Sequence, residues 1–128
     1  MKKIAVSILI LLLLMVTACQ KTETTPELSG TVAIYTEDTE IVVEEVVTHA
    51  TNVEDVLVET CQKNKIPYTL TNNMFDNFGG ISSTQTDGWI LYVNGEIAQA
   101  GAKFIPMENN FLVEFKYVNY DMVFNQIQ

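Results

Sequence analysis

The 128-residue chain contains no arginine, a single histidine and only two cysteines. Its seven basic residues are all lysines and stand against sixteen acidic residues, for a formal net charge of −9. Nucleic-acid binding needs clustered Lys and Arg to neutralise phosphates, so this balance excludes a nucleic-acid partner. The same acidity would keep an exposed domain soluble and would repel it from anionic membrane surfaces.

The scarcity of histidine and cysteine argues against catalysis and against a metal site. His49 stands alone between a predicted strand and a predicted helix, where a surface or capping role is typical. Cys61 falls on the apolar face of that helix, where a thiol is usually inert packing. The chain has no His pair, no Cys-x-x-Cys motif and no EF-hand spacing among its acidic residues. We expect no enzyme activity, no catalytic residue, no required cofactor and no bound metal.

Residues 1–18 are predicted to be a lipoprotein signal peptide. Lys2 and Lys3 precede an apolar run, Ile4 to Met15, that is too short to span a bilayer. The run leads into Val16-Thr17-Ala18-Cys19, where a bacterial lipobox has its cysteine. We therefore expect Cys19 to be the lipidated first residue of the mature protein. A diacylglyceryl group together with an amide-linked acyl chain would give stable membrane attachment. An ordinary signal peptide with an unmodified Cys19 is the alternative.

The rest of the chain divides into a tether, one domain and a tail. Residues 19–29 are polar and are predicted to be the lipidated tether. Residues 30–118 are predicted to form the domain, and residues 119–128 a C-terminal tail that covers a sheet edge or frays. We therefore expect a domain held by lipid on the extracellular face of the bacterial cytoplasmic membrane.

The first half of the domain predicts a hairpin followed by a helix. Gly30–Thr36 and the β-branched segment Ile41–Val47 are typical of paired strands. Glu44 and Glu45 interrupt the apolar pattern of the second strand, which indicates a sheet edge. Thr51-Asn52-Val53-Glu54 has the capping-box pattern, with Thr51 capping a helix that runs to about Asn64.

The second half predicts further strands around a long polar loop, Asn72 to Asp87. Trp89–Val93 lies between an Asp-Gly and an Asn-Gly turn and is apolar on both faces, which is typical of a central strand covered on both sides. Phe111–Tyr117 alternates apolar and polar residues and predicts another strand. The predicted fold is an α+β, β-grasp-like domain. An N-terminal β-hairpin and one crossover helix precede a mixed sheet that packs on the helix.

The order and spacing of several short segments resemble the transcobalamin-like C-terminal domain family. They are the helix Val53 to Asn64 followed by Tyr68-Thr69-Leu70, the turn Phe78 to Ser83, the strand Gly88 to Gly95, and Ala100 to Phe104. The resemblance covers about Thr31 to Tyr117. The family includes lone domains of bacterial surface lipoproteins and the final domain of transcobalamin and intrinsic factor. It therefore implies the β-grasp-like fold, with cobalamin or another corrinoid as a candidate ligand.

Aromatic side chains next to glycine-rich backbone are the candidate ligand-binding residues. A flat, uncharged ligand needs stacking surfaces and nearby backbone donors. Phe75 and Phe78 lie in the polar loop with Gly79 and Gly80, while Trp89 and Tyr92 lie on opposite faces of their strand. The alternative is that Trp89 and Phe78 pack in the core. Phe75 decides more sharply between the two, because an aromatic in a polar loop has less reason to be buried.

The sequence therefore predicts an extracellular, membrane-anchored binding lipoprotein. Its hypothesised role is to capture a small ligand, such as cobalamin or another corrinoid, for uptake by a membrane transporter. The alternative hypothesis is a protein–protein interaction module of the cell envelope with no small-molecule ligand. That module would use the exposed strand edge or the acidic hairpin turn.

Overall fold

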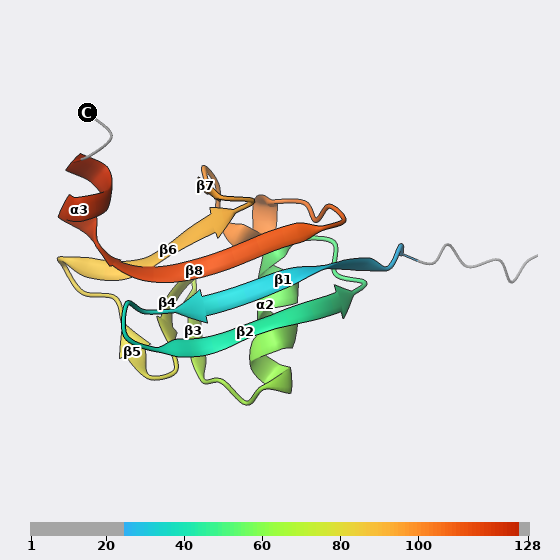
Figure 1. Ribbon diagram of the computed structural model, residues 1–128, viewed down its shortest axis with the longest axis horizontal. Helices are drawn as coiled ribbons and strands as arrows, with labels where there is room; N and C mark the ends of the chain where they lie inside the picture. Colours follow the sequence, from blue (N-terminus) through green and yellow to red (C-terminus); the bar gives the residue numbers. More distant parts are fainter. Residues whose placement is uncertain (1–24, 126–128) are drawn as a thin grey trace, which may run out of the picture.

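The computed structural model describes residues 25–125, so the predicted signal peptide, Cys19 and residues 126–128 lie outside the described part. Two sheets, two α-helices and one 3-10 helix make up the described part of the α+β domain (Figure 1). One sheet has the order β2-β1-β8-β6-β7, and the other β3-β4-β5. The elements are β1 (Leu28–Tyr35), β2 (Glu40–Thr48), α2 (Val53–Lys63), β3 (Tyr68–Thr71), β4 (Met74–Phe78), β5 (Ile81–Ser82), β6 (Asp87–Val93), β7 (Glu96–Ile97), the 3-10 helix η1 (Ala102–Phe104), β8 (Phe111–Asn119) and α3 (Tyr120–Phe124).

The predicted hairpin is confirmed as β1 and β2, which pair antiparallel. The Thr36 N–H donates to the Thr39 carbonyl oxygen at 2.8 Å and closes the turn between the two strands. β2 is the edge strand of the larger sheet, as its two glutamates predict, and Glu45 lies on the exposed side. β1 begins at Leu28, two residues earlier than the sequence suggests.

The central strand of the larger sheet is β8, which pairs parallel with β1 and antiparallel with β6. The prediction that Trp89–Val93 is the central strand, covered on both faces, is therefore wrong. β6 lies between β8 and the two-residue β7, and its outward side chains Ile90 and Tyr92 are half-buried. The expected Asp-Gly turn is also absent, because Asp87 and Gly88 already belong to β6.

Helix α2 covers the inner face of the larger sheet (Figure 1). Its buried side chains are those that the helical spacing predicts: Val53, Val56, Leu57, Thr60 and Cys61. The predicted cap is wrong by one residue. The Asn52 side chain, and not that of Thr51, accepts a hydrogen bond from the Asp55 N–H at 2.9 Å, and Asn52 has the extended backbone of a cap.

The region predicted to be a long loop forms most of the smaller sheet, so that prediction is wrong. β3 and β4 meet at a two-residue turn, Asn72-Asn73, in which both residues have positive φ. β4 and β5 meet at Gly79-Gly80, again with positive φ at both positions. Turns of this kind match the twist of the strands that they join.

A register shift in the smaller sheet controls which side chains reach the core. Thr69 pairs with Asn77 and Leu70 with Phe75, which leaves Asp76 as an extra residue in β4. Phe75 and Phe78, three residues apart, are consequently both buried. Phe78 packs with Phe75, Trp89 and Phe115 at ring-centroid distances of 5.2, 5.1 and 4.9 Å. This aromatic cluster joins the two sheets.

Candidate functional site

A pocket of about 340 Å³ opens at the edge of β6 that faces away from β8. The start of β4, the segment from β7 to η1, and single aromatic residues of β8 and α3 complete its walls. It is lined by Asn73, Met74, Phe75, Trp89, Ile90, Leu91, Ile97, Ala98, Gln99, Ala100, Gly101, Ala102, Phe115 and Phe124.

The walls of this pocket carry no charged side chain. Asn73 and Gln99 supply the polar side-chain groups, and the remaining lining is apolar or aromatic. Small residues form one wall, because Ala98, Ala100 and Gly101 leave the backbone close to the pocket. A hydrated ion would lose its water in such a site without gaining a charged side chain to pair with. The site therefore suits a neutral ligand.

The free edge of β6 adds backbone hydrogen-bonding groups to the site. The Trp89 N–H donates to Ser83 Oγ at 3.3 Å, and the Leu91 carbonyl oxygen accepts from the Ala98 N–H at 2.9 Å. Both bonds point away from β8, and the N–H and C=O of one residue lie on the same side of a strand. The Trp89 carbonyl and the Leu91 N–H therefore lie on this edge as well, outside the two residues of β6 that pair with β7.

Only two of the predicted ligand-binding residues meet at this pocket. Phe75 and Trp89 both line it, although each is mostly buried, with 5% and 6% of its surface exposed. Phe78 is fully buried and lies behind them in the core, so the core alternative describes it correctly. Phe75 is buried too, because it belongs to β4 and not to a polar loop.

The other predicted ligand-binding residues lie elsewhere. Gly79 and Gly80 form the turn between β4 and β5 and do not line the pocket. Tyr92 lies on the outer face of the sheet, where the Lys116 ammonium is 4.4 Å from its ring centroid. Lys116 also approaches Glu114, which accepts a 2.8 Å hydrogen bond from the Tyr35 hydroxyl. Burial and this bond to Glu114 raise the pKa of Tyr35.

Sequence reasoning missed the Ile97–Ala102 wall, Phe115 and Phe124. The run Ala98 to Ala102 is rich in small residues, which is the one available signal that backbone approaches a ligand or another strand there. Phe115 fits an ordinary core position of an alternating strand, and Phe124 lies in the tail. Neither carries a local pattern that indicates a pocket.

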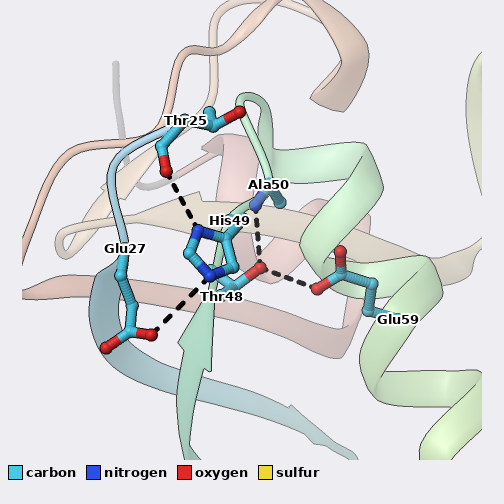
Figure 2. Close-up of polar contacts among 6 residues, drawn as sticks. All are labelled: Thr25, Glu27, Thr48, His49, Ala50 and Glu59. Carbon is cyan, nitrogen blue, oxygen red and sulfur yellow. Dashed lines mark hydrogen bonds and ion pairs between the residues drawn. The ribbon is translucent and has the colours of Figure 1, made fainter. Parts of the chain in front are cut away.

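His49 takes part in a surface contact with the first described residues (Figure 2). Its Nδ1 lies 3.0 Å from the Thr25 carbonyl oxygen and its Nε2 lies 3.6 Å from the Glu27 carboxylate. The adjacent Thr48 hydroxyl donates to Glu59 at 2.7 Å and ties the end of β2 to α2. His49 thus has the surface role that the sequence predicts. It follows the end of β2 and lies beside Thr25 and Glu27.

Cys61 is fully buried in the core, and burial raises the pKa of its thiol to about 11. A thiol with so little thiolate at neutral pH is a poor nucleophile. In the described part of the chain, no three His, Cys, Asp or Glu side chains are grouped as metal ligands. None of the helices between residues 25 and 125 has the length and apolar character needed to cross a membrane.

Two solved structures share this fold at low sequence identity. Haptocorrin in complex with Cbi superposes with a TM-score of 0.67 and 15% sequence identity, over 78% of this chain and 27% of the haptocorrin chain. The chain thus spans about a quarter of the length of that relative. A candidate metal binding protein from Ruminococcus gnavus ATCC 29149 superposes with a TM-score of 0.58 and 18% identity, over 72% of this chain and 97% of the other.

Residues 50–119, more than half of the chain, match the family DUF4430, a domain of unknown function. The chain therefore belongs to the DUF4430 family. Comparison with curated proteins gave no match. The matched range runs from the residues before α2 to the end of β8 and leaves out both the β1–β2 hairpin and α3.

Proposed function

We propose that this chain is a lipid-anchored binding protein on the extracellular face of the bacterial cytoplasmic membrane. It captures a small, neutral ligand in the β6 pocket and delivers it to a membrane transporter. The observation that carries the proposal is the pocket itself, which combines an uncharged lining with free backbone groups at a strand edge. The sequence around Cys19 supports the lipid anchor.

A corrinoid is the first ligand to test. The likeness to haptocorrin in complex with Cbi supports this choice. A corrin ring carries carboxamide side chains, which pair with the amides of Asn73 and Gln99 or with the free backbone groups of β6. The pocket of 340 Å³ is at the small end of the range of ligand pockets, which is about 300–1,000 Å³. It would therefore hold only one edge of the corrin ring.

The proposed activity is binding without catalysis and without a cofactor. Neither His49 nor Cys61 lines the pocket, so neither is placed to exchange a proton with a ligand or to attack it. The polar groups that do face the pocket are amides, which hold a neutral ligand by hydrogen bonds.

A titration with cyanocobalamin tests the proposal, using a chain without its first 19 residues. Corrin absorbance and heat of binding should show saturable one-to-one binding. Ala100→Trp places an indole in the pocket from an exposed position and should weaken binding at least about tenfold. Val47→Trp, on the outer face of β2, is the matched control and should bind like the wild-type chain.

Absence of binding at high cyanocobalamin concentration would count against the corrinoid. Equal affinity of the wild-type chain and Ala100→Trp would place any binding outside this pocket. Either result would move attention to the second candidate function.

The second candidate is a protein-interaction module, and the free edge of β2 favours it. β2 has nine residues, pairs only with β1 among the described strands, and exposes Val43 and Val47 by 51% and 65%. An extended segment of a partner could add a strand there. A chain with Val43→Asp and Val47→Asp should then lose an envelope partner that the wild-type chain retains without any small ligand. Equal retention by both chains would exclude this edge.

A further inference from the structure

Helix α3 follows the last residue of the DUF4430 match yet supplies a wall of the pocket. We propose that α3 is a selectivity element of this chain, with Phe124 as its specificity-determining side chain. The inference rests on the proposed function, because it assigns a role within the same pocket. The ligand class is a neutral molecule that presents a flat apolar edge to Phe124.

The start of α3 is anchored to the start of β6 by hydrogen bonds. The Tyr120 N–H donates to the Thr86 carbonyl oxygen at 2.9 Å, and Asn119 Nδ2 donates to the Asp87 carboxylate at 3.3 Å. The Asn119 carbonyl oxygen of the side chain also caps the helix, accepting from the N–H groups of Asp121 and Met122. These bonds anchor the helix next to the start of β6. Figure 1 shows α3 directly after the end of β8.

Gly88 provides the space for this anchor. A Cβ atom at position 88 would overlap the Tyr120 hydroxyl and would crowd Ser83 Oγ. Any other residue would therefore displace the Tyr120 ring from this position. The sequence alone suggests that Gly88 belongs to a turn. In the structure Gly88 is a strand residue that leaves room for the Tyr120 side chain.

Phe124 lies one helical turn after Tyr120, and the two rings are 6.4 Å apart. Phe124 is 47% exposed and lines the pocket together with Trp89 and Leu91. An exposed phenylalanine gains most when a flat ligand covers it. Phe124 should therefore favour ring-shaped apolar ligands and slow their release.

Phe124→Ala tests the inference by two independent measurements. Acrylamide quenching of Trp89, the only tryptophan, reports access through the pocket and needs no ligand. Removal of the Phe124 wall should raise the quenching slope, because Phe124 and Trp89 line the same pocket. Affinity for cyanocobalamin should fall about two- to tenfold, the worth of one aromatic contact. Met122→Ala is the control, because Met122 is 67% exposed on the same helix and does not line the pocket.

The two measurements separate this inference from the proposed function. An unchanged quenching slope in Phe124→Ala, or an equal rise in Met122→Ala, would overturn the inference. If cyanocobalamin binds the wild-type chain and Phe124→Ala equally well, the selectivity role fails while the binding function stands. If cyanocobalamin does not bind at all, the corrinoid proposal fails and the quenching comparison alone decides whether α3 walls the pocket.

Discussion

The indole N–H of Trp89 donates a 2.8 Å hydrogen bond to the carbonyl oxygen of Ile81. The bond joins β6 of the larger sheet to β5 of the smaller one. It satisfies the polar atom of a mostly buried ring and fixes the ring plane at the pocket wall. The pocket is therefore preorganised on this side, and ligand binding does not have to order the tryptophan.

Trp89→Phe should lower the free energy of unfolding by about 1–3 kcal/mol, because it leaves the Ile81 carbonyl without its donor. Urea unfolding followed by circular dichroism measures the change. Tyr92→Phe is the control, since its ring lies on the outer face of the sheet, and it should change stability by about 0.5 kcal/mol or less. If Trp89→Phe lowered the free energy of unfolding no more than Tyr92→Phe does, the hydrogen bond to Ile81 would contribute little to stability.

The cap of α2 offers a direct comparison of two adjacent residues. Asn52→Ala should destabilise the protein by about 0.5–2 kcal/mol, since the Asp55 N–H loses its acceptor. Thr51→Ala should have almost no effect, because the cap hydrogen bond comes from Asn52. Thermal unfolding of both variants measures the difference. The reverse order would restore Thr51 as the cap.

The buried thiol predicts a pH dependence of stability in the alkaline range. The thiol of Cys61 has its pKa raised by burial from an ordinary 9.0 to about 11. Between these values the folded chain keeps a proton that the unfolded chain has lost, so the free energy of unfolding falls as pH rises. Urea titrations at several pH values should show this fall in the wild-type chain. Cys61→Ala should lack that part of it, and identical pH profiles would contradict the assignment.

The neutral lining of the pocket predicts binding that is insensitive to salt. Screening weakens interactions between exposed charges, and none of the lining side chains is charged. Affinity for a neutral ligand should therefore change less than about twofold between roughly 0.05 and 0.5 M salt. Isothermal calorimetry at both concentrations measures it. A steep salt dependence would indicate that charged residues outside this pocket hold the ligand.

The hairpin, helix α2 and strand β8 were predictable because each is specified locally by its own apolar period. The smaller sheet was not. The extra residue Asp76 puts Phe75 and Phe78 on the same side of β4, so the spacing of three conceals the strand alternation. Asn72-Asn73 and Gly79-Gly80, which resemble loop composition, are the tight turns of two hairpins.

The candidate site was predictable only in part, because distant segments build it. Trp89 and Phe75 are large aromatics near turns, and composition alone draws attention to them. The Ala98–Leu91 hydrogen bond brings the Ile97–Ala102 wall next to them. Phe124 reaches the pocket because Gly88 leaves room for Tyr120 of the same helix. These are tertiary contacts, which no local periodicity specifies.

The position of β8 has a consequence for how the chain folds. β8 is the last of the described strands in the sequence, yet it lies between β1 and β6 at the middle of the larger sheet. A chain emerging from a ribosome or a membrane channel can pair β1 with β2, but β1 and β6 have no common neighbour until Asn119 has emerged. We expect folding to be late and cooperative, with Val32 and Ile34 exposed to solvent or chaperones until the final strand inserts.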